Sequence, residues 1–292
     1  MPAFQLRKLA VFGVGLIGGS FACALKQAGA VQAVCGVGRS RSNLERALQL
    51  GVIDEIASDA QSAMAGADFV LVAVPVAQTD RVLREIAPYL PPDCVVTDAG
   101  STKQDVAMAA RQALGAKRRQ FVPAHPIAGA ELSGVEAASP TLFRGRLVVL
   151  TPLDDTPSDA CARVESAWQI CGARVTQMTP KRHDQVFAAV SHLPHALAFA
   201  LVEMIAKRPD AQELFSFAGA GFRDFTRIAG SSPEMWRDIC VANREALLSE
   251  LSAFQAALAT LTEHIRSGEA SDIEALFRDA RSARDHWING GK

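Results

Sequence analysis

The amino-acid sequence predicts an α/β fold, in which a doubly wound, mostly parallel sheet is followed by an all-helical domain. In the first half, short apolar runs bounded by turn residues alternate with amphipathic segments, a pattern typical of parallel strands buried on both faces. A glycine-rich turn follows the first run directly. Beyond Thr179 we predict no further strand, and apolar residues recur at the helical period. The two domains are therefore placed at residues 1–179 and 180–292.

Six apolar runs account for the predicted strands. They are Leu9–Phe12, Ala33–Val37, Phe69–Val74, Cys94–Thr97, Gln120–Pro123 and Leu147–Leu150. Helical segments separate them, such as the one that follows the glycines and continues through Gln27. Strands connected in this way form the sheet of a doubly wound domain.

Helical spacing defines the second domain. Apolar residues stand three or four positions apart at Val186, Val190, Leu193, Leu197 and Leu201. Pro194 lies within this stretch and is expected to kink or break the helix. Further on, Ser232, Pro233 and Glu234 are typical of a helix start, as N-cap, first-turn proline and first-turn acid.

The helix that Ser232 opens is expected to carry a long apolar seam with alternating gaps of four and three. Its residues are Leu247, Leu251, Phe254, Leu258, Leu261 and Ile265. One more helix is expected from Asp272 to Trp287. A helical domain of about 110 residues has little else to cover this seam, so we expect a homodimer through the helical domain. A seam buried within the monomer is the alternative.

Composition excludes several classes of protein. The 292 residues exceed the usual size of one domain. Thirty Lys+Arg balance 31 Asp+Glu, so we expect neither a nucleic-acid nor a membrane partner. No charge-free apolar run of about 18 residues is found, which argues against a spanning helix. The six cysteines are scattered without a C-x-x-C pair, which indicates a cytoplasmic protein with reduced thiols.

The glycine-rich turn has the spacing G-x-G-x-x-G, and it reads Gly13-Val-Gly15-Leu16-Ile17-Gly18. Gly13 permits a tight turn, Gly15 lets the backbone approach a pyrophosphate, and Gly18 lets the helix pack on the strand. The first amides of the helix then bind the phosphates. Between a strand and a helix, this turn predicts a Rossmann-type dinucleotide-binding domain. A purely structural glycine turn is the alternative.

The end of the second predicted strand distinguishes NAD from NADP. NAD enzymes usually carry an acid there, whereas this chain has Arg39, Ser40 and Arg41. Two guanidinium groups and a hydroxyl suit a 2′-phosphate, so NADP is favoured over NAD. NAD binding beside solvated arginines is the alternative. Val74 and Pro75 should lie beside the cofactor, because ligands bind at the carboxyl ends of strands in such sheets.

Residues suited to acid–base chemistry follow two later strands. Ser101 follows the fourth predicted strand and His125 the fifth, each in a loop. Because imidazole titrates near neutrality, His125 suits taking a proton from a substrate hydroxyl as hydride departs. Ser101 would hydrogen-bond the same hydroxyl or the base. A structural histidine is the alternative.

The helical half supplies a second group of polar residues. Ser191 and His195 are four positions apart and share a face if the helix continues. Arg227 offers a planar fork that matches a carboxylate, and Asp224 or Glu131 would orient or gate it. A solvated loop is the alternative for these charges. No spacing typical of a closed metal site accompanies the histidines, so no metal is expected.

Five motifs occur in order along nearly the whole chain. They are Gly13-x-Gly15-Leu-Ile-Gly18-Gly19-Ser20, Asp98-x-Gly-Ser101-x-Lys103, His125-Pro-x-Ala-Gly-x-Glu131, Ser191-His192-Leu-Pro-His195 and Gly221-Phe-Arg-Asp224-Phe-Thr-Arg227. This series resembles the prephenate/arogenate dehydrogenases of tyrosine biosynthesis. The resemblance implies a Rossmann-type domain, an all-helical domain that forms a homodimer, and oxidative decarboxylation with hydride transfer to NAD(P)⁺.

The resemblance also implies roles for single residues. It makes His125 the base or hydrogen-bond acceptor for the ring C4 hydroxyl, and Ser101 the link between that hydroxyl, His125 and the nicotinamide. It makes Arg227 the anchor of a substrate carboxylate. Pocket roles are implied for Ser191 and His195, and gating or supporting roles for Glu131 and Asp184.

Some questions stay open at this point. The family often has an acid where this chain has Gly38, a departure that fits NADP. No motif distinguishes prephenate from arogenate, or decides whether tyrosine inhibits. Another two-domain NADP oxidoreductase, such as a β-hydroxyacid dehydrogenase or an imine reductase, would not need His125 together with Arg227. A regulatory protein that senses the cofactor would have no reason to keep both.

Overall fold

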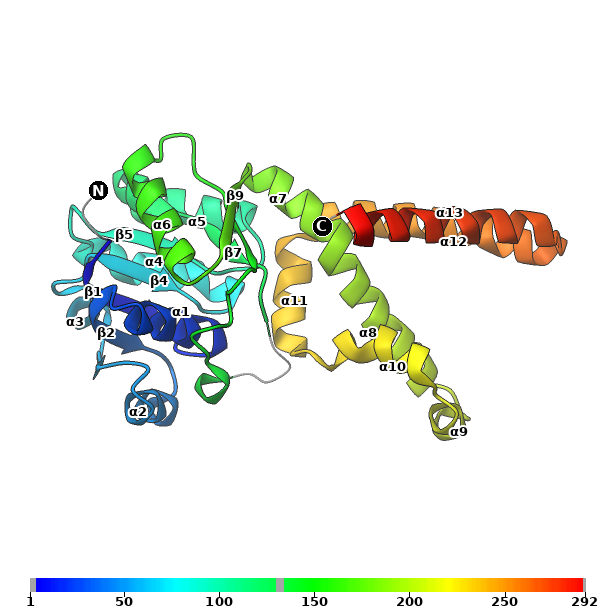
Figure 1. The fold of residues 1–292 in the computed structure, drawn as a ribbon, viewed down its shortest axis with the longest axis horizontal. Coiled ribbons are helices and arrows are strands. Elements are labelled where there is room, and N and C mark those ends of the chain that lie inside the picture. Colours follow the sequence, from blue (N-terminus) through cyan, green and yellow to red (C-terminus); the bar gives the residue numbers. More distant parts are fainter. Residues whose placement is uncertain (1–3, 130–133, 291–292) are drawn as a thin grey trace. The chain divides into compact units, whose positions relative to one another are not determined.

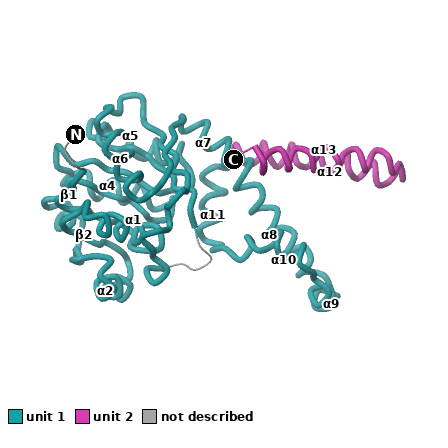
Figure 2. The backbone as a smooth tube through the Cα atoms, in the orientation of Figure 1, with its two compact units in different colours: residues 1–244 teal, residues 245–292 magenta. Residues whose placement is uncertain are grey.

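The computed structural model describes residues 4–129 and 134–290. The chain forms two compact units, residues 1–244 and residues 245–292 (Figure 2). The first unit contains both sheets and most of the helices, whereas the second consists of two long helices (Figure 1).

A parallel sheet of six strands forms the centre of the first unit. Its strands, in spatial order, are β3 (Glu55–Ile56), β2 (Val31–Val37), β1 (Leu6–Phe12), β4 (Phe69–Val72), β5 (Val95–Asp98) and β6 (Phe121–Val122). Every pairing in this sheet is parallel. The strand order reverses between β1 and β4, and ligands of such sheets bind outside the carboxyl ends of the strands at this reversal.

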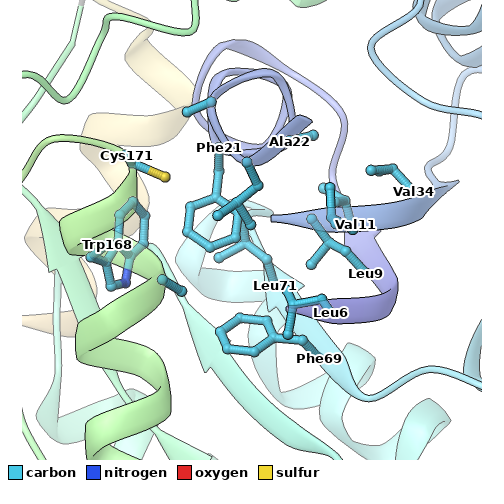
Figure 3. Packing of buried hydrophobic residues seen from close by; sticks show 14 of the residues in the cluster. Leu6, Leu9, Val11, Phe21, Ala22, Val34, Phe69, Leu71, Trp168 and Cys171 are labelled. Atoms are coloured by element: carbon cyan, nitrogen blue, oxygen red, sulfur yellow. The ribbon is translucent and has the colours of Figure 1, made fainter. Parts of the chain in front are cut away.

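Helices cover both faces of the sheet, as the sequence predicts for a doubly wound domain. They are α1 (Leu16–Gln27), α2 (Arg41–Gln49), α3 (Ala60–Met64), α4 (Thr79–Ile86), α5 (Gln104–Leu114) and α6 (Ser158–Ile170). Two apolar clusters result. One holds Phe21 of α1 and Trp168 of α6, whose ring centroids are 4.6 Å apart (Figure 3). The other includes Leu83 and Ile86 of α4. β4 contributes to both clusters, which is why its residues are all apolar and all buried.

A second, smaller sheet was not distinguished in the sequence. It consists of β7 (Ala124–Pro126), β8 (Leu147–Leu150) and β9 (Arg174–Gln177), with β7 antiparallel to β8 and β8 parallel to β9. β7 changes the expected setting of His125, which lies within a strand opposite Val149 and not in a loop. β3 and β9 also escaped prediction, because β3 has two residues and β9 is mostly exposed.

Five helices complete the first unit: α7 (Pro180–Phe187), α8 (Leu193–Ala206), α9 (Ala211–Ser216), α10 (Ala220–Thr226) and α11 (Pro233–Ala242). A π-helical turn, Ala188–His192, separates α7 from α8 and places Pro194 in the first turn of α8. The helix therefore changes its hydrogen-bonding pattern just before Pro194 but continues through it, where the sequence predicted a kink or a break. Within the described residues after β9, the structure contains no strand.

The helical stretch Pro180–Ala206 bears on the expectation that the chain has no helix able to span a membrane. By length and composition it is apolar enough to cross a membrane, a test that core helices of other proteins also pass. Only 22% of its most apolar 18-residue segment is buried inside the structure. Three of its polar side chains, His183, Asp184 and His192, are buried and hydrogen-bonded, so this part of the stretch belongs to a packed polar network.

The predicted seam helix is divided in two. Ser232 caps α11 as expected, its Oγ accepting a hydrogen bond from the amide of Met235. The helix then ends, and Asn243 has non-helical dihedral angles before α12 (Arg244–Ser267) begins. The seam residues therefore all lie on α12. The last helix, α13 (Ala270–Gly290), is confirmed and extends beyond the predicted ends.

Candidate active site

The glycine turn between β1 and α1 is shaped by close backbone contacts. Gly13 has φ +100°, and a Cβ there would lie 2.4 Å from the carbonyl oxygen of Ala73. A Cβ on Gly18 would lie 2.2 Å from the carbonyl oxygen of Gly13. A Cβ on Gly15, in contrast, would meet no atom within 4 Å. The turn thus keeps an open space beside Gly15, the N-cap of α1.

The residues around this space fit the pyrophosphate of a dinucleotide. No side chain caps α1 and no acid occupies its first turn, which begins with Leu16 and Ile17. The first amides of the helix are therefore available to an anion. Val74 follows β4 beside this turn, since its amide nitrogen would lie 3.1 Å from a Cβ on Gly13, and Pro75 comes next.

The three residues expected to select NADP differ in the contacts that they make. The Oγ of Ser40 accepts a hydrogen bond from the amide of Asn43 and caps α2. The side-chain amide of Asn43 donates to the carbonyl of Val14, which joins this turn to the glycine turn. Arg41 donates to Glu45 at 2.9 Å. Within the described part of the chain, the exposed Arg39 makes neither a hydrogen bond nor an ion pair.

A buried ion pair fixes the loop that follows β5. Nζ of Lys103 lies 2.5 Å from Oδ2 of Asp98 and 2.9 Å from the carbonyl oxygen of Ala124. Oδ1 of Asp98 accepts a hydrogen bond from the amide of Ala124, and Oδ2 accepts one from Gly100. Both charged side chains are almost fully buried. The pair ties the loop that carries Ser101 to the residue that precedes His125.

His125 begins a chain of hydrogen bonds. Its Nδ1 lies 2.8 Å from Nε2 of His183, and Nδ1 of His183 lies 2.8 Å from Oδ1 of Asp184. Asp184 also accepts hydrogen bonds from the backbone amides of Lys103 and Gln104, at the start of α5. Residues of β7, α7 and α5 are thereby joined around one partly buried imidazole.

Burial keeps these imidazoles neutral. It lowers the pKa of His125 well below the ordinary value, and positive charge on His183, Lys103 or His192 would lower it further. Burial also lowers the pKa of His183. Burial alone would raise the pKa of Asp184, but hydrogen bonds from His183, Gln104 and Lys103 bring it below the ordinary value. At neutral pH the hydrogen-bonded series therefore consists of the carboxylate of Asp184 and the neutral imidazoles of His183 and His125.

His192 lies in the π-helical turn and is also buried. Its Nδ1 accepts a hydrogen bond from the side-chain amide of Asn243, which donates to the carbonyl of Asp184 as well. Burial lowers the pKa of His192 to about 4. Asn243 thus connects the end of α11 to α7 and to the π-helical turn.

The substrate residues expected in the helical half lie near one another. Nδ1 of His195 donates to the carbonyl oxygen of Ser191 at 2.9 Å. Burial lowers the pKa of His195, and the positive charge of Arg227 lowers it further, which places the two side chains within electrostatic range. Arg227 is exposed and follows α10 directly. Glu131 lies outside the described residues.

Sequence reasoning missed several polar residues. Lys103 and Asp98 were named only within a motif, and His183, Trp236 and Asn243 received no role from the sequence. A usable signal existed for His183 and Asp184, because they sit in the first turns of a helix capped by Thr179. Among the described residues no group of three or more His, Cys, Asp or Glu could hold a metal.

The fold and the site define a dinucleotide-dependent dehydrogenase with a helical second part. The model "Prephenate dehydrogenase, nucleotide-binding domain" matches residues 21–177, and "Prephenate dehydrogenase, dimerization domain" matches residues 179–279. The chain belongs to the prephenate dehydrogenase family, so the expected resemblance is confirmed.

Individual relatives agree with this assignment. A prephenate dehydrogenase of Bacillus subtilis is 38% identical over 94% of this chain and 73% of its own length. A cyclohexadienyl dehydrogenase of Zymomonas mobilis is 35% identical over 95% of both chains. The solved prephenate dehydrogenase of A. aeolicus, in complex with hydroxyphenyl propionate and NAD⁺, superposes with a TM-score of 0.91. It is 35% identical, and the match covers 97% of this chain and 99% of that one.

Proposed function

We propose that this protein catalyses the oxidative decarboxylation of prephenate and/or arogenate with hydride transfer to NAD(P)⁺. The products are 4-hydroxyphenylpyruvate and/or tyrosine. The observation that carries the proposal is the imidazole of His125, held 2.8 Å from His183 and fastened beside the Ser101 loop by the contacts of Lys103 with Asp98 and Ala124. Family membership supplies the class of substrate.

We assign the cofactor site to the glycine turn and its neighbours. Gly13, Gly15, Leu16, Ile17 and Gly18 would hold the pyrophosphate at the start of α1. The strand-end residues Val74 and Pro75, together with Ser101, would lie along the rest of the cofactor. When bound, the nicotinamide supplies a hydride acceptor.

For the cofactor's identity we favour NADP over NAD. Arg39 makes no hydrogen bond or ion pair within the described residues, so its guanidinium is available to a 2′-phosphate. The hydroxyl of Ser40 and the start of α2 would add to the binding of this phosphate. Arg41 is held by Glu45 and would contribute mainly charge.

His125 has the central chemical role in the proposal. It accepts the proton of the C4 hydroxyl while the hydrogen on C4 leaves as hydride. The bond between C1 and its carboxylate then breaks, carbon dioxide departs, and the electron pair completes the aromatic ring. The resulting phenolate recovers the proton from His125. Ser101 would hydrogen-bond the C4 oxygen and hold it toward the imidazole.

The helical half would bind the anionic end of the substrate. Arg227 would anchor a carboxylate through its planar fork. Support comes from the position of Arg227 within electrostatic range of His195, whose hydrogen bond to Ser191 keeps the ring in place. Ser191 and His195 would line the pocket, and Glu131 would gate it.

We further propose a homodimer through the helical domain and a domain boundary at 179/180. Support for this boundary comes from the two family models, one of which ends at residue 177 while the other begins at residue 179. Large apolar side chains of the first unit are exposed in this region, including Val190 (68%) and Val241 (66%) in helical turns and Phe217 (81%) just after α9. A second copy would remove them from water. A cytoplasmic location, with neither nucleic acid nor membrane as partner, stays a prediction.

Steady-state kinetics with each substrate and each cofactor test the proposed function. We expect release of carbon dioxide and formation of NADPH in equal amounts, with prephenate, arogenate or both. Turnover of neither substrate with either cofactor would contradict the proposal. Sedimentation or light scattering of the same preparation tests the dimer.

A further inference from the structure

We propose that Asp184 and His183 are positioning residues that fix the tautomer of His125, with the proton on Nδ1 and the free electron pair on Nε2. This inference rests on the proposed function, in which His125 takes the proton of the substrate hydroxyl. It assigns a purpose to two buried polar groups that do not themselves need to touch the substrate.

The direction of each hydrogen bond follows from the chemistry of the groups. An ionised carboxylate only accepts, so Nδ1 of His183 donates to Oδ1 of Asp184 across 2.8 Å. A neutral imidazole carries one N–H, so Nε2 of His183 must accept. The donor at 2.8 Å is Nδ1 of His125. His125 then has its electron pair on Nε2, which makes no hydrogen bond within the described part of the chain.

The carboxylate at the start of this chain is held in its ionised form. Oδ1 of Asp184 accepts a hydrogen bond from the amide of Lys103 at 2.8 Å, and Oδ2 accepts one from Gln104 at 2.9 Å. These amides belong to the start of α5, where a negative charge is favoured. Hydrogen bonds from His183 and these amides lower the pKa of Asp184. Because the carboxylate of Asp184 stays ionised, it cannot donate a proton, and the direction of the hydrogen bonds from His125 to His183 and from His183 to Asp184 is fixed.

Other charged groups lie near these hydrogen bonds without changing their direction. The charge of Lys103 is compensated by Asp98 at 2.5 Å. Burial raises the pKa of Asp105, which lies in the first turn of α5. Burial lowers the pKa of His192 in the π-helical turn to about 4, so this ring is neutral near pH 7. The direction of the hydrogen bonds is therefore set by Asp184.

The arrangement also explains why the donors and acceptors come from two parts of the first unit. His125 belongs to the small sheet, whereas His183 and Asp184 belong to α7. Phe187 of α7 packs its ring edge-on to His125, with centroids 4.8 Å apart, and so restricts the rotation of the imidazole. One helix thus sets both the orientation and the protonation of the base.

A structural role is the competing explanation, because Asp184 also binds two consecutive backbone amides. Asp68 offers a matched control within this chain. Its carboxylate accepts hydrogen bonds from the consecutive amides of Arg7 and Lys8 and from the Arg7 guanidinium, but at the amino end of β4 and with no histidine attached. Asp68→Asn therefore weakens hydrogen bonds to two backbone amides, as Asp184→Asn does, but leaves the tautomer of His125 unchanged.

Nitrogen NMR of the wild-type enzyme labelled with [¹⁵N]histidine tests the tautomer directly. His125→Asn identifies the His125 signals by their disappearance. We expect the protonated nitrogen of wild-type His125 to be Nδ1, and this signature should weaken or reverse in His183→Phe and Asp184→Asn. A structural role alone would leave the tautomer of His125 unchanged in Asp184→Asn.

Kinetics complete the test. We expect kcat to fall by on the order of 100-fold in His183→Phe, with dissociation constants for NADP⁺ nearly unchanged. Asp184→Asn should lose kcat in the same way, and Asp68→Asn should stay within about twofold of wild type. A wild type that turns over neither substrate would contradict the proposed function. An active wild type with the proton of His125 on Nε2, or a His183→Phe variant with normal kcat, would overturn this inference alone.

Discussion

The ring of His195 lies flat against the indole of Trp236, with centroids 3.6 Å apart and an angle of 18° between the planes. Nδ1 of His195 is engaged by the carbonyl of Ser191. The imidazole is therefore held on one face and at one nitrogen, and its Nε2 edge is the part left for a ligand. Trp236 also packs with Val76, which follows β4, so the indole connects α11 to the carboxyl edge of the main sheet.

The first prediction concerns this stacked pair. Trp236→Ala should raise KM for the acid substrate by about tenfold, because His195 loses the surface that orients it. The free energy of unfolding should fall by about 3 kcal/mol as a cavity forms among buried side chains. Trp236→Phe keeps an aromatic face, and within the described residues the indole N–H has no hydrogen-bond partner to lose. A Phe variant as impaired as the Ala variant would argue against stacking as the cause.

The second prediction concerns the proposed base. His125→Asn should lower kcat by about 100- to 10,000-fold, since the side chain no longer takes the hydroxyl proton. Cofactor affinity, measured by titration of the intrinsic tryptophan fluorescence, should change little because the glycine turn is untouched. Normal turnover in this variant would remove His125 from the mechanism.

The third prediction concerns the proposed carboxylate anchor. Arg227→Ala should raise KM strongly, by about 100-fold, because a bidentate charged contact is lost. Arg227→Lys should recover only part of this loss, since an ammonium lacks the planar fork. Arg223→Ala is the matched control, as Arg223 is an exposed arginine of α10, the short helix that Arg227 follows. Equal effects at both positions would indicate general electrostatics and not an anchor.

The fourth prediction concerns cofactor selection. Arg39→Asp should shift the ratio of kcat/KM values from NADP⁺ toward NAD⁺, because a carboxylate repels the 2′-phosphate and accepts from the ribose hydroxyls. Arg39→Ala should weaken NADP⁺ binding alone. Arg46→Ala removes one charge from α2 at a residue that pairs with Glu136 and serves as the control. An unchanged ratio in Arg39→Asp would refute the role of Arg39.

The sequence was most informative for elements that are defined by a local pattern, such as an apolar run or a helix start. The strands β4 and β8 are continuous apolar runs, β1 ends in such a run at Leu9–Phe12, and Ser232 with Pro233 starts α11 where predicted. The break at Asn243 was missed because the apolar period continues on both sides of it. Its cause is tertiary, since the Asn243 side chain donates to the carbonyl of Asp184 and to His192.

The sequence indicated single candidate residues of the site but not the hydrogen bonds that connect them. His125 and Ser101 follow strands, so sheet topology predicts that they lie near the cofactor turn. The contact of His125 with His183 joins positions 58 residues apart in the sequence, and no local pattern encodes such a contact. The same holds for Lys103 and Ala124, which only the fold brings together.

The last prediction concerns stability at low pH. The pKa values of His125, His183 and His192 are all lowered by burial in the folded state. As the pH falls below the ordinary value of 6.5, the unfolded chain takes up these protons first. The stabilisation from the neutral rings is thus fully present above this pH and is lost as the pH falls toward about 4, where His192 titrates when folded.

For His192 alone, the shift from 6.5 to about 4 corresponds to a loss on the order of 3 kcal/mol. Urea unfolding followed by circular dichroism between about pH 7 and pH 4.5 measures it, at a fixed protein concentration because association also stabilises the fold. His192→Asn should flatten the dependence, since asparagine does not titrate and its carbonyl still accepts from Asn243. A free energy of unfolding that stays level or rises over this interval would show that the buried rings are not the groups that titrate.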